Sequence, residues 1–568
     1  MTKSIVSVLA AAFFLAVGSL NDATAQDASF DIVRFQIEGN SILPAERVQQ
    51  LVAPFVGQRK NYGDVQKALE ALEGEFRRLG YGTVQVYVPE QELTTGVVRL
   101  QVSQGVVGKV AITGNKYFNN ENVRASLPNL KEGVAPNMRQ LSENVQLSNE
   151  NPAKQVEVTL GVSEEEGKVD IKVEVKEENP ERIYLTLDNT GTKGSGKHRV
   201  GVSYQNANVN NGDQVLTLAY TTAADPPGGM KILGNRMIPG QDGNGVKVDI
   251  FSIGYRLPLY SLGDSIDFIY GNSSTDSPAN SPNLGTGLAI NGKGEVFGFR
   301  YNHIFPRAGE FTSKLVFGYD YKYMNSRCTV AGVPTPFGGA GCTPHTFRPV
   351  SATYSGQWQK PGEAIDFNVG VVHNLFPMGS RFDYANAPLS TAPGGNDRYS
   401  AASGYQTKDE FSALRFGGSY SAAVAGEWLL RVAASGQHAN NALPAGERLG
   451  LAGSNAVRGF LERAVVSDRG YFANIEVYSP DIAVTLGVPG SLKWLVFYDS
   501  AQGASLNPTL NQKVNIASAG IGVRYNLKKD VSARFDIARV MDGVWPNAAP
   551  NIALEGDIRG HFGLAFGF

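Results

Sequence analysis

This sequence has no long apolar run beyond its N-terminus, no excess of charge of either sign and very little cysteine. No later segment approaches the ~18 consecutive apolar residues of a membrane-spanning helix, which argues against a helical membrane protein. Its 51 basic and 53 acidic residues nearly cancel, so no overall positive field indicates a nucleic-acid partner. Glycine (65 residues), phenylalanine (28) and tyrosine (23) are abundant, whereas charged residues make up only 18%. This composition is typical of a transmembrane β-barrel, whose apolar signal is diluted by alternation.

Only two cysteines are present, Cys328 and Cys342, in one stretch rich in glycine, proline and threonine. In an exported protein, two cysteines this close in one loop are expected to form a disulfide. We expect no metal site, because the two thiols and the nearby His345 lack a fourth ligand.

The N-terminus has the three parts of a secretory signal peptide. Lys3 precedes the apolar run of residues 5–17, and Ala-Thr-Ala follows at 23–25. This pattern predicts a signal peptide of residues 1–25, cleaved after Ala25. The alternative, an uncleaved signal anchor, is disfavoured by the polar sequence that follows.

Residues 30–178 contain an internal repeat. Phe35-Gln-Ile-Glu-Gly-Asn40 recurs as Val110-Ala-Ile-Thr-Gly-Asn115, with an offset of 75 residues at each matched position. Each copy continues with two segments of helical spacing and two alternating segments, so the predicted order is β-α-α-β-β twice. The sequence therefore predicts two small α/β domains, residues 30–104 and 105–178, before a larger domain of residues 181–568.

This pair of domains resembles POTRA domains, the periplasmic modules of outer-membrane secretion and assembly barrels. The resemblance implies that they handle unfolded chains. Physically, a short edge strand beside a helix can add an extended peptide by backbone hydrogen bonding. A rigid spacer is the alternative.

From residue 181 onward the chain alternates between segments of about ten residues with strand periodicity and turn signals. We count sixteen strand candidates, from Ile183–Asn189 to Arg559–Phe568. Short turns alternate with long loops, which predicts periplasmic turns and extracellular loops. In the last candidate, Phe562, Phe566 and the terminal Phe568 share a face opposite small residues, as expected of a strand with lipid outside. We expect Phe568 to act as a C-terminal assembly signal. The predicted fold is a sixteen-strand antiparallel barrel.

A motif between the eleventh and twelfth candidates carries the most specific signal. The loop of residues 450–462 contains Val457-Arg458-Gly459-Phe460, and the thirteenth candidate contains Phe497-Tyr-Asp499. A bidentate pair of Arg458 with Asp499 could fasten the loop in one position, because such pairs are strong and directional. Gly459 would permit the turn that points the arginine inward. A solvated arginine and an unrelated aspartate are the alternative.

These two motifs are similar to the hallmarks of the POTRA-plus-barrel superfamily, in which the loop folds back into the barrel lumen. Two such domains and sixteen strands resemble in particular the TpsB family of two-partner secretion transporters, the haemolysin activation/secretion proteins of the ShlB/FhaC/HecB type. In many of these, an N-terminal helix plugs the pore. Only a few residues separate the predicted cleavage site from Phe30, so we expect the Arg458 loop to do most of any closing here.

The resemblance implies a translocase in the outer membrane of a Gram-negative bacterium, with its POTRA domains in the periplasm. It would accept an unfolded, large secreted partner protein and pass it through the barrel. The expected further partners are outer-membrane lipid and, during biogenesis, the barrel-assembly machinery; no nucleic acid and no cofactor are expected. We expect no enzymatic activity, since Gly191–Lys197 only imitates a phosphate loop, with His198 in place of the required Ser/Thr. An insertase for other barrels is the first alternative, and a diffusion porin the second.

Overall fold

The structure is a computed structural model of the chain. It describes residues 29–92, 95–191, 196–225, 248–274, 294–324, 345–375, 411–506, 513–543 and 553–568, together with the backbone of 230–233, 236–239, 329–330 and 333–334. The predicted signal peptide and the predicted Cys328–Cys342 disulfide lie outside these residues.

The chain divides into two compact units. One holds the residues up to Gly108, together with Glu132–Met138 and Val162–Val169. The other holds Lys109–Lys131, Arg139–Gly161 and Asp170–Phe568.

The first module, residues 30–103, has the predicted β-α-α-β-β order. Strand β2 (Arg34–Glu38) is followed by helices α1 (Ala45–Val52) and α2 (Tyr62–Arg78) and by strands β4 (Gln85–Tyr87) and β5 (Val97–Ser103). The sheet order is β2-β5-β4, with β2 parallel to β5 and β4 antiparallel to it. A short pair, β1 (Phe30–Ile32) with β3 (Gly57–Lys60), and a 3₁₀ turn at Ala53–Phe55 complete the module.

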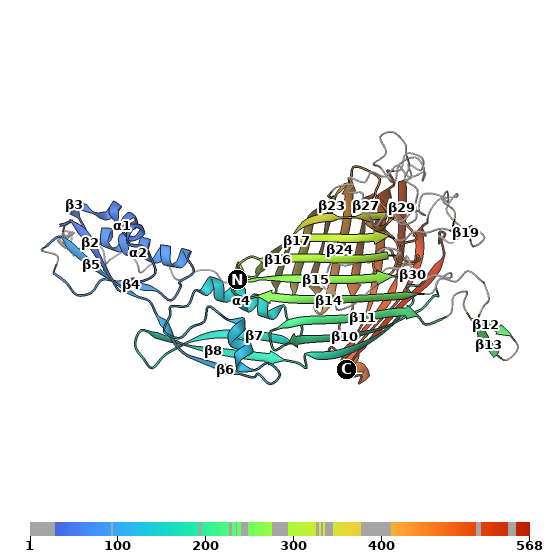
Figure 1. The fold of residues 1–568 in the computed structure, drawn as a ribbon, viewed down its shortest axis with the longest axis horizontal. Helices are drawn as coiled ribbons and strands as arrows, with labels where there is room; N and C mark the ends of the chain where they lie inside the picture. Colours follow the sequence, from blue (N-terminus) through green and yellow to red (C-terminus); the bar gives the residue numbers. More distant parts are fainter. Residues whose placement is uncertain are drawn as a thin grey trace, which may run out of the picture. The chain divides into compact units, whose positions relative to one another are not determined.

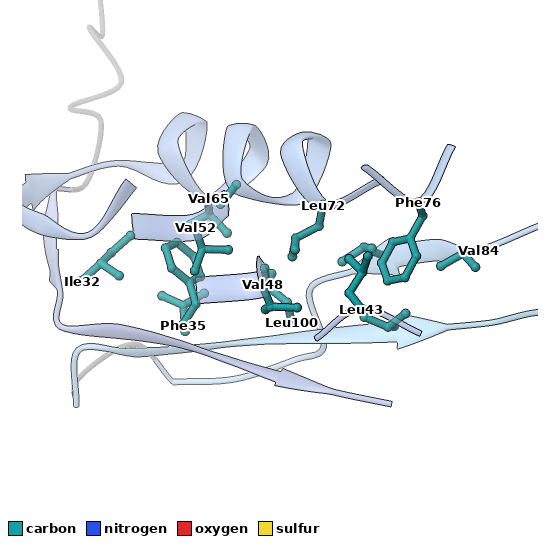
Figure 2. Close-up of a cluster of buried hydrophobic side chains, with 14 residues drawn as sticks. Ile32, Phe35, Leu43, Val48, Val52, Val65, Leu72, Phe76, Val84 and Leu100 are labelled. Carbon is teal, nitrogen blue, oxygen red and sulfur yellow. The ribbon is translucent and has the colours of Figure 1, made fainter. Parts of the chain in front are cut away.

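The core of this module lies between the two helices and the sheet. Helix α2 begins at a capping box, in which Asn61 and Asp64 each accept a hydrogen bond from the other's backbone N–H. Its periodic apolar residues Leu72 and Phe76 are buried. Figure 2 shows side chains of both helices and of the strands pointing toward one another in one cluster. The 3.6-residue spacing therefore selects the face of α2 that the sheet covers.

The second module, residues 106–177, repeats this order. It comprises β6 (Val106–Thr113), α3 (Asn120–Ser126), α4 (Met138–Asn149), β7 (Lys154–Val162) and β8 (Lys168–Glu177). The sheet order is β6-β8-β7, so the last strand is again central. Its buried apolar residues include Phe118, Val123, Leu141, Leu147, Val156, Ile171 and Val173.

The Gly-Asn pairs of the sequence repeat occupy equivalent positions in the two modules. Gly39 and Gly114 have positive φ angles of 76° and 87°, and a Cβ on either would lie 2.4 or 2.3 Å from a carbonyl oxygen of the module's last strand. The Nδ2 groups of Asn40 and Asn115 each donate to the carbonyl three residues later, at 2.8 and 2.9 Å. Only glycine fits both the backbone conformation and the close approach.

The rest of the chain closes into an antiparallel β-barrel, drawn from green to red in Figure 1. Strands β20 and β21 are interrupted only at Arg348; counted as one, they give sixteen strands, which confirms the predicted fold. The last strand pairs with the first, from Gly563↔Asp188 to Gly567↔Tyr184. The strands are β9 (Glu181–Asp188), β10 (Arg199–Val209), β11 (Gln214–Ala223), β14 (Asp249–Leu259), β15 (Asp264–Ser273), β16 (Gly294–Ile304), β17 (Phe311–Met324), β20 (His345–Phe347) with β21 (Pro349–Lys360), β22 (Glu363–Asn374), β23 (Ser412–Ala425), β24 (Trp428–Ala439), β27 (Arg469–Tyr478), β28 (Ser491–Ala504), β29 (Lys513–Leu527), β30 (Val531–Asp542) and β31 (Ile558–Gly567).

Each wall strand has an apolar outer face and an inner face that contacts the lumen. On β28, Val496 and Tyr498 are exposed by 42% and 48%, whereas the alternate residues Phe497 and Asp499 are buried. Exposed aromatic residues recur on neighbouring strands, with Phe268 on β15 and Phe299 on β16 in edge contact. This alternation is the pattern of a wall with lipid outside. No helix among the described residues is both long and apolar enough to cross a bilayer.

The second module is joined to two turns of the barrel by a buried polar network, which we call the joint. Lys154 of β7 forms an ion pair with Asp213, at the β10–β11 turn, and their side chains are 0% and 1% exposed. Asn122 Nδ2 and the Tyr260 hydroxyl also donate to the Asp213 carboxylate, at 2.9 and 2.5 Å. Asn151 Nδ2 donates to the carbonyl of Ala207 at 2.7 Å. Burial lowers the pKa of Lys154, and the Asp213 charge opposes that shift.

Candidate functional site

The candidate site is the loop that connects β24 to β27, residues 440–468, hereafter the lumen loop. Two of its segments pair as a short ladder, β25 (Leu449–Gly450) with β26 (Val466–Ser467). Between them the chain packs against the inner wall: Leu451, Val457 and Phe460 are fully buried with apolar residues of β28, β29 and β30. The loop therefore occupies the lumen instead of extending away from the barrel.

Arg458 at the loop tip meets Asp499 in a bidentate pair. Arg458 Nε donates to Asp499 Oδ2 and its second terminal nitrogen to Oδ1, both at 2.7 Å. The backbone N–H of Arg458 donates to the same carboxylate at 3.1 Å. Asp499 is 0% exposed, because it lies on the inner face of β28 under the loop. Three hydrogen bonds to one carboxylate fix both the side chain and the backbone of the tip.

Two further carboxylates surround the same guanidinium. Glu476 of β27 lies 2.9 Å and Asp536 of β30 lies 3.5 Å from one terminal nitrogen of Arg458. These acids have cations of their own: Arg431 pairs with Glu476 at 3.0 Å, and Arg524 pairs with Asp536 at 2.8 Å. Three arginines thus face three carboxylates, which balances the buried charge.

An aromatic ring completes the pocket of the arginine. The Arg458 Cζ atom lies 3.4 Å from the centroid of the Phe497 ring, on the inner face of β28 two residues before Asp499. A guanidinium over an aromatic face is attracted by the ring quadrupole, more strongly where water is excluded. The first and last residues of the Phe-Tyr-Asp motif, Phe497 and Asp499, therefore contact the loop tip.

The residue after the arginine is held by the last barrel strand. Gly459 has a φ of 95°, and a Cβ there would lie 3.2 Å from Val540 Cγ2. Its backbone N–H donates to Nε2 of His561 on β31 at 2.9 Å, so this nitrogen is unprotonated. The contact joins the loop tip to the strand that closes the barrel on β9.

The structure therefore brings together Val457, Arg458, Gly459, Phe460, Phe497 and Asp499. Phe568 lies elsewhere, at the seam: its backbone N–H donates to the Ile183 carbonyl at 2.9 Å, while its side chain is 71% exposed. Sequence reasoning missed Glu476, Asp536 and His561. The alternation of each strand places these polar residues on its inner face, which was the available signal. It does not identify the loop atom that each residue contacts. Within the described residues, no group of three His, Cys, Asp or Glu side chains is arranged to hold a metal.

Comparison with known proteins gives two family matches. A POTRA domain of the ShlB type matches residues 30–105. The haemolysin secretion/activation protein ShlB/FhaC/HecB family matches residues 167–333 and 367–525, which is more than half of the chain.

Individual relatives are distant in sequence. The outer membrane transporter CdiB-2 of Burkholderia pseudomallei is 26% identical over 169 residues, which make up 29% of this chain and only 28% of that protein. The heme/hemopexin transporter protein HuxB of Haemophilus influenzae is 18% identical over 540 residues, 92% of this chain and 86% of that protein.

The solved structure of CdiB from Escherichia coli has a TM-score of 0.68 at 17% identity, and the match covers 98% of this chain and 93% of that one. CdiB from Acinetobacter baumannii gives 0.65 at 13% identity, with 95% and 90% covered. At these identities the likeness shows a shared fold. The family matches over the first module and most of the barrel show that the chain belongs to the haemolysin secretion/activation proteins of the ShlB/FhaC/HecB type, the two-partner (TpsB) secretion transporters of the bacterial outer membrane.

Proposed function

We propose that this protein receives one unfolded partner protein in the periplasm and exports it through the barrel lumen. The observation that carries the proposal is the lumen loop, which is held inside a closed barrel by ion pairs and hydrogen bonds at its tip. Such contacts can be broken and remade without unfolding the wall. Two relatives are named an outer membrane transporter and a heme/hemopexin transporter protein. We infer that this chain is likewise a transporter, and that its cargo is a secreted protein.

The two modules are the proposed receiving surface. We assign them to residues 30–104 and 105–178, ahead of a barrel of residues 181–568. In the first module, β2 and β4 are the outer strands of the three-stranded sheet. An extended segment of the partner can add to such an edge by backbone hydrogen bonds, which do not depend on its sequence. The exposed Tyr87 on β4 offers an apolar contact beside this edge.

The proposed route is lined by paired charges. Arg256 with Asp267 and Arg300 with Asp320 form ion pairs of 2.7 and 2.6 Å across neighbouring strands. A wall of this kind offers an extended polypeptide hydrogen-bonding partners and no continuous apolar surface on which it would stall. We assign the driving force to folding of the partner outside, where burial of its apolar surface disfavours return. No catalytic step is part of this account.

Deletion of the gene tests the proposal. We expect one large protein to disappear from the medium, and plasmid-borne wild-type protein to restore it. Arg458→Ala should restore less export at an equal amount of folded barrel, because the loop tip has lost its three bonds to Asp499. An insertase would instead show a general loss of unrelated outer-membrane barrels after deletion. If the protein were a porin, the deletion strain would lose permeability to small solutes but would still secrete every protein. The insertase result or the porin result would overturn the proposal.

A further inference from the structure

The lumen loop has a second set of buried ion pairs, at residues that precede the Arg458 tip. We call residues 443–448 the loop base. Within it, Glu447 and Arg448 are consecutive residues of opposite charge, and both side chains are largely buried. Glu447 contacts the barrel wall, whereas Arg448 contacts the other end of the lumen loop and the residue after β28.

Glu447 is held by two cations from the wall. One carboxylate oxygen lies 2.7 Å from Lys322 Nζ on β17, and the other lies 2.6 Å from a terminal nitrogen of Arg415 on β23. The Glu447 side chain is 1% exposed. Its carbonyl oxygen also accepts a hydrogen bond of 3.0 Å from Gln437 Nε2 on β24. A buried carboxylate with both oxygens paired is costly to separate from its cations.

Arg448 is directed to the other side. Its Nε lies 3.0 Å from Asp468, immediately before β27, and a terminal nitrogen donates to Ser505, just after β28, at 3.1 Å. The Asp468 carboxylate also accepts backbone hydrogen bonds from Leu443 at 2.9 Å and from Leu506 at 2.6 Å. This aspartate therefore ties both ends of the lumen loop to the end of β28.

The two sets of contacts reach arcs of the wall that meet at β27 and β28 and extend from there in opposite directions. In the barrel order, the loop base spans from β17 through β23 and β24 to β28. The tip contacts β27, β28, β30 and β31, through Glu476, Asp499, Asp536 and His561. The side chains that hold Glu447 are not those that hold Arg458, so the two attachments share no partner.

We propose that Glu447 and Asp468 are positioning residues that hold the base of the lumen loop across the barrel independently of the Arg458 tip. The loop then leaves the lumen only when both attachments are released. Loss of the tip pair alone leaves the base held against β17 and β23. This inference rests on the proposed function for the need to move the loop, but its test uses the loop position and does not require export.

The test is a double-variant cycle on the purified full-length protein in planar lipid bilayers. The variants are Arg458→Ala at the tip, Glu447→Ala at the base and the two combined. The measured quantity is the ratio of time spent in the widest conducting state to time spent closed. We expect Glu447→Ala to raise this ratio by about tenfold or more, because a buried pair loses one partner. The double variant should show the product of the two single effects, as expected for sites without shared contacts.

Two matched variants separate the role of the charge from general damage. Glu447→Gln keeps the shape of the side chain and removes its charge, so it should behave like Glu447→Ala. Glu427→Ala removes an exposed acid at the β23–β24 turn and should leave the ratio unchanged. A shift in electrophoretic mobility on heating shows for each variant that the barrel is folded.

A second measurement follows the loop itself. Ala456 is buried in the lumen loop, and its carbonyl accepts from Asn474 on the wall. Each protein is given the additional substitution Ala456→Cys and is labelled with a membrane-impermeant thiol reagent. The signal of the same protein without this cysteine is subtracted. We expect labelling to be lowest in the protein with an intact tip and base, higher in each single variant and highest in the double variant. A double variant that conducts and labels no more than Arg458→Ala alone would overturn the proposal. So would a Glu447→Gln variant that matches the unsubstituted protein in both measurements.

Discussion

The joint between the second module and the barrel makes a quantitative prediction. Asp213→Asn removes the charge that faces Lys154. Asn122 and the Tyr260 hydroxyl donate to different oxygens of the carboxylate, and the amide keeps one of these two acceptors. The ammonium of Lys154, 0% exposed, is then left without a counterion. Breaking a buried pair in this way costs about 3–5 kcal/mol. Deprotonation of the lysine sets a ceiling, because neutralising an amine of ordinary pKa of about 10.4 at pH 7 costs about 4.6 kcal/mol at ~1.36 kcal/mol per unit.

The assay is hydrogen exchange of the full-length protein in lipid nanodiscs. The backbone N–H of Glu178, which donates to the Ala153 carbonyl, and that of Ala207, which donates to the Pro180 carbonyl, report opening of the joint, with distances of 2.9 Å in both cases. A cost of about 3 to 4.6 kcal/mol corresponds to exchange that is faster by between about 100-fold and about 2,000-fold at these amides. The exchange rates of backbone amides in the β28–β29 ladder should be the same as in the unsubstituted protein.

Two further variants complete the reasoning. Lys154→Met combined with Asp213→Asn leaves no buried charge and should return exchange to within about tenfold of the unsubstituted protein. Lys529→Met is the matched control, since this lysine is 57% exposed and pairs with Glu178 at 3.2 Å. An exposed pair is worth about 0–1 kcal/mol, so the control should change exchange by less than about fivefold. If the reporter amides exchanged no faster in Asp213→Asn than in the control, or faster in the double variant than in Asp213→Asn, the reasoning would be refuted.

Three other outcomes are expected. Hydrogen bonds from Arg78 lower the pKa of Glu75 from 4.5 to about 2; the stabilisation of the first module from this group is therefore present above pH 4.5 and lost as pH falls toward 2. The melting temperature, followed by circular dichroism at 222 nm, should fall more steeply between pH 4.5 and 2 in the unsubstituted protein than in Glu75→Gln. Parallel plots of melting temperature against pH would contradict this prediction. From the sequence, Cys328 and Cys342 should form a disulfide closing a loop of 15 residues, with a model-dependent stabilisation of ~3 kcal/mol; two labelled thiols in the unreduced, denatured protein would contradict it. Deletion of Phe568, whose side chain is 71% exposed, should lower the amount of assembled barrel through lost recognition, and unchanged membrane levels would refute that.

The barrel could be predicted from the sequence because each wall strand borders two different environments. The outer residues Val496 and Tyr498 are exposed and the inner residue Asp499 contacts the loop. The sequence of the strand therefore alternates between apolar and polar residues. The repeat could also be recognised from the sequence. Gly39 and Gly114 each have a positive φ and lie too close to a carbonyl oxygen for any other residue. The short β1–β3 pair was not predicted, because three or four residues carry too little periodicity.

Only part of the candidate site could be predicted from the sequence. Resemblance pointed to Arg458 and Asp499, and the structure places them together. The other members of the cluster depend on strand register and barrel closure. Glu476 and His561 reach the loop tip from β27 and β31, and nothing local to either residue indicates that contact. The joint was missed for the same reason: Lys154 and Asp213 lie in different domains of the sequence and meet only when a turn of the barrel contacts β7.

Passage of the partner through the lumen is the central claim, and site-specific photo-crosslinking tests it most directly. Asn368 and Val369 are adjacent on β22, both exposed, with Val369 on the outer face at 47% and Asn368 on the inner face. A photo-reactive amino acid is placed at one position or the other in cells that export the partner identified by gene deletion. We predict a covalent adduct of the partner with the Asn368 position and none with the Val369 position. Continued export with no adduct at Asn368, or with equal adducts at both positions, would contradict the account.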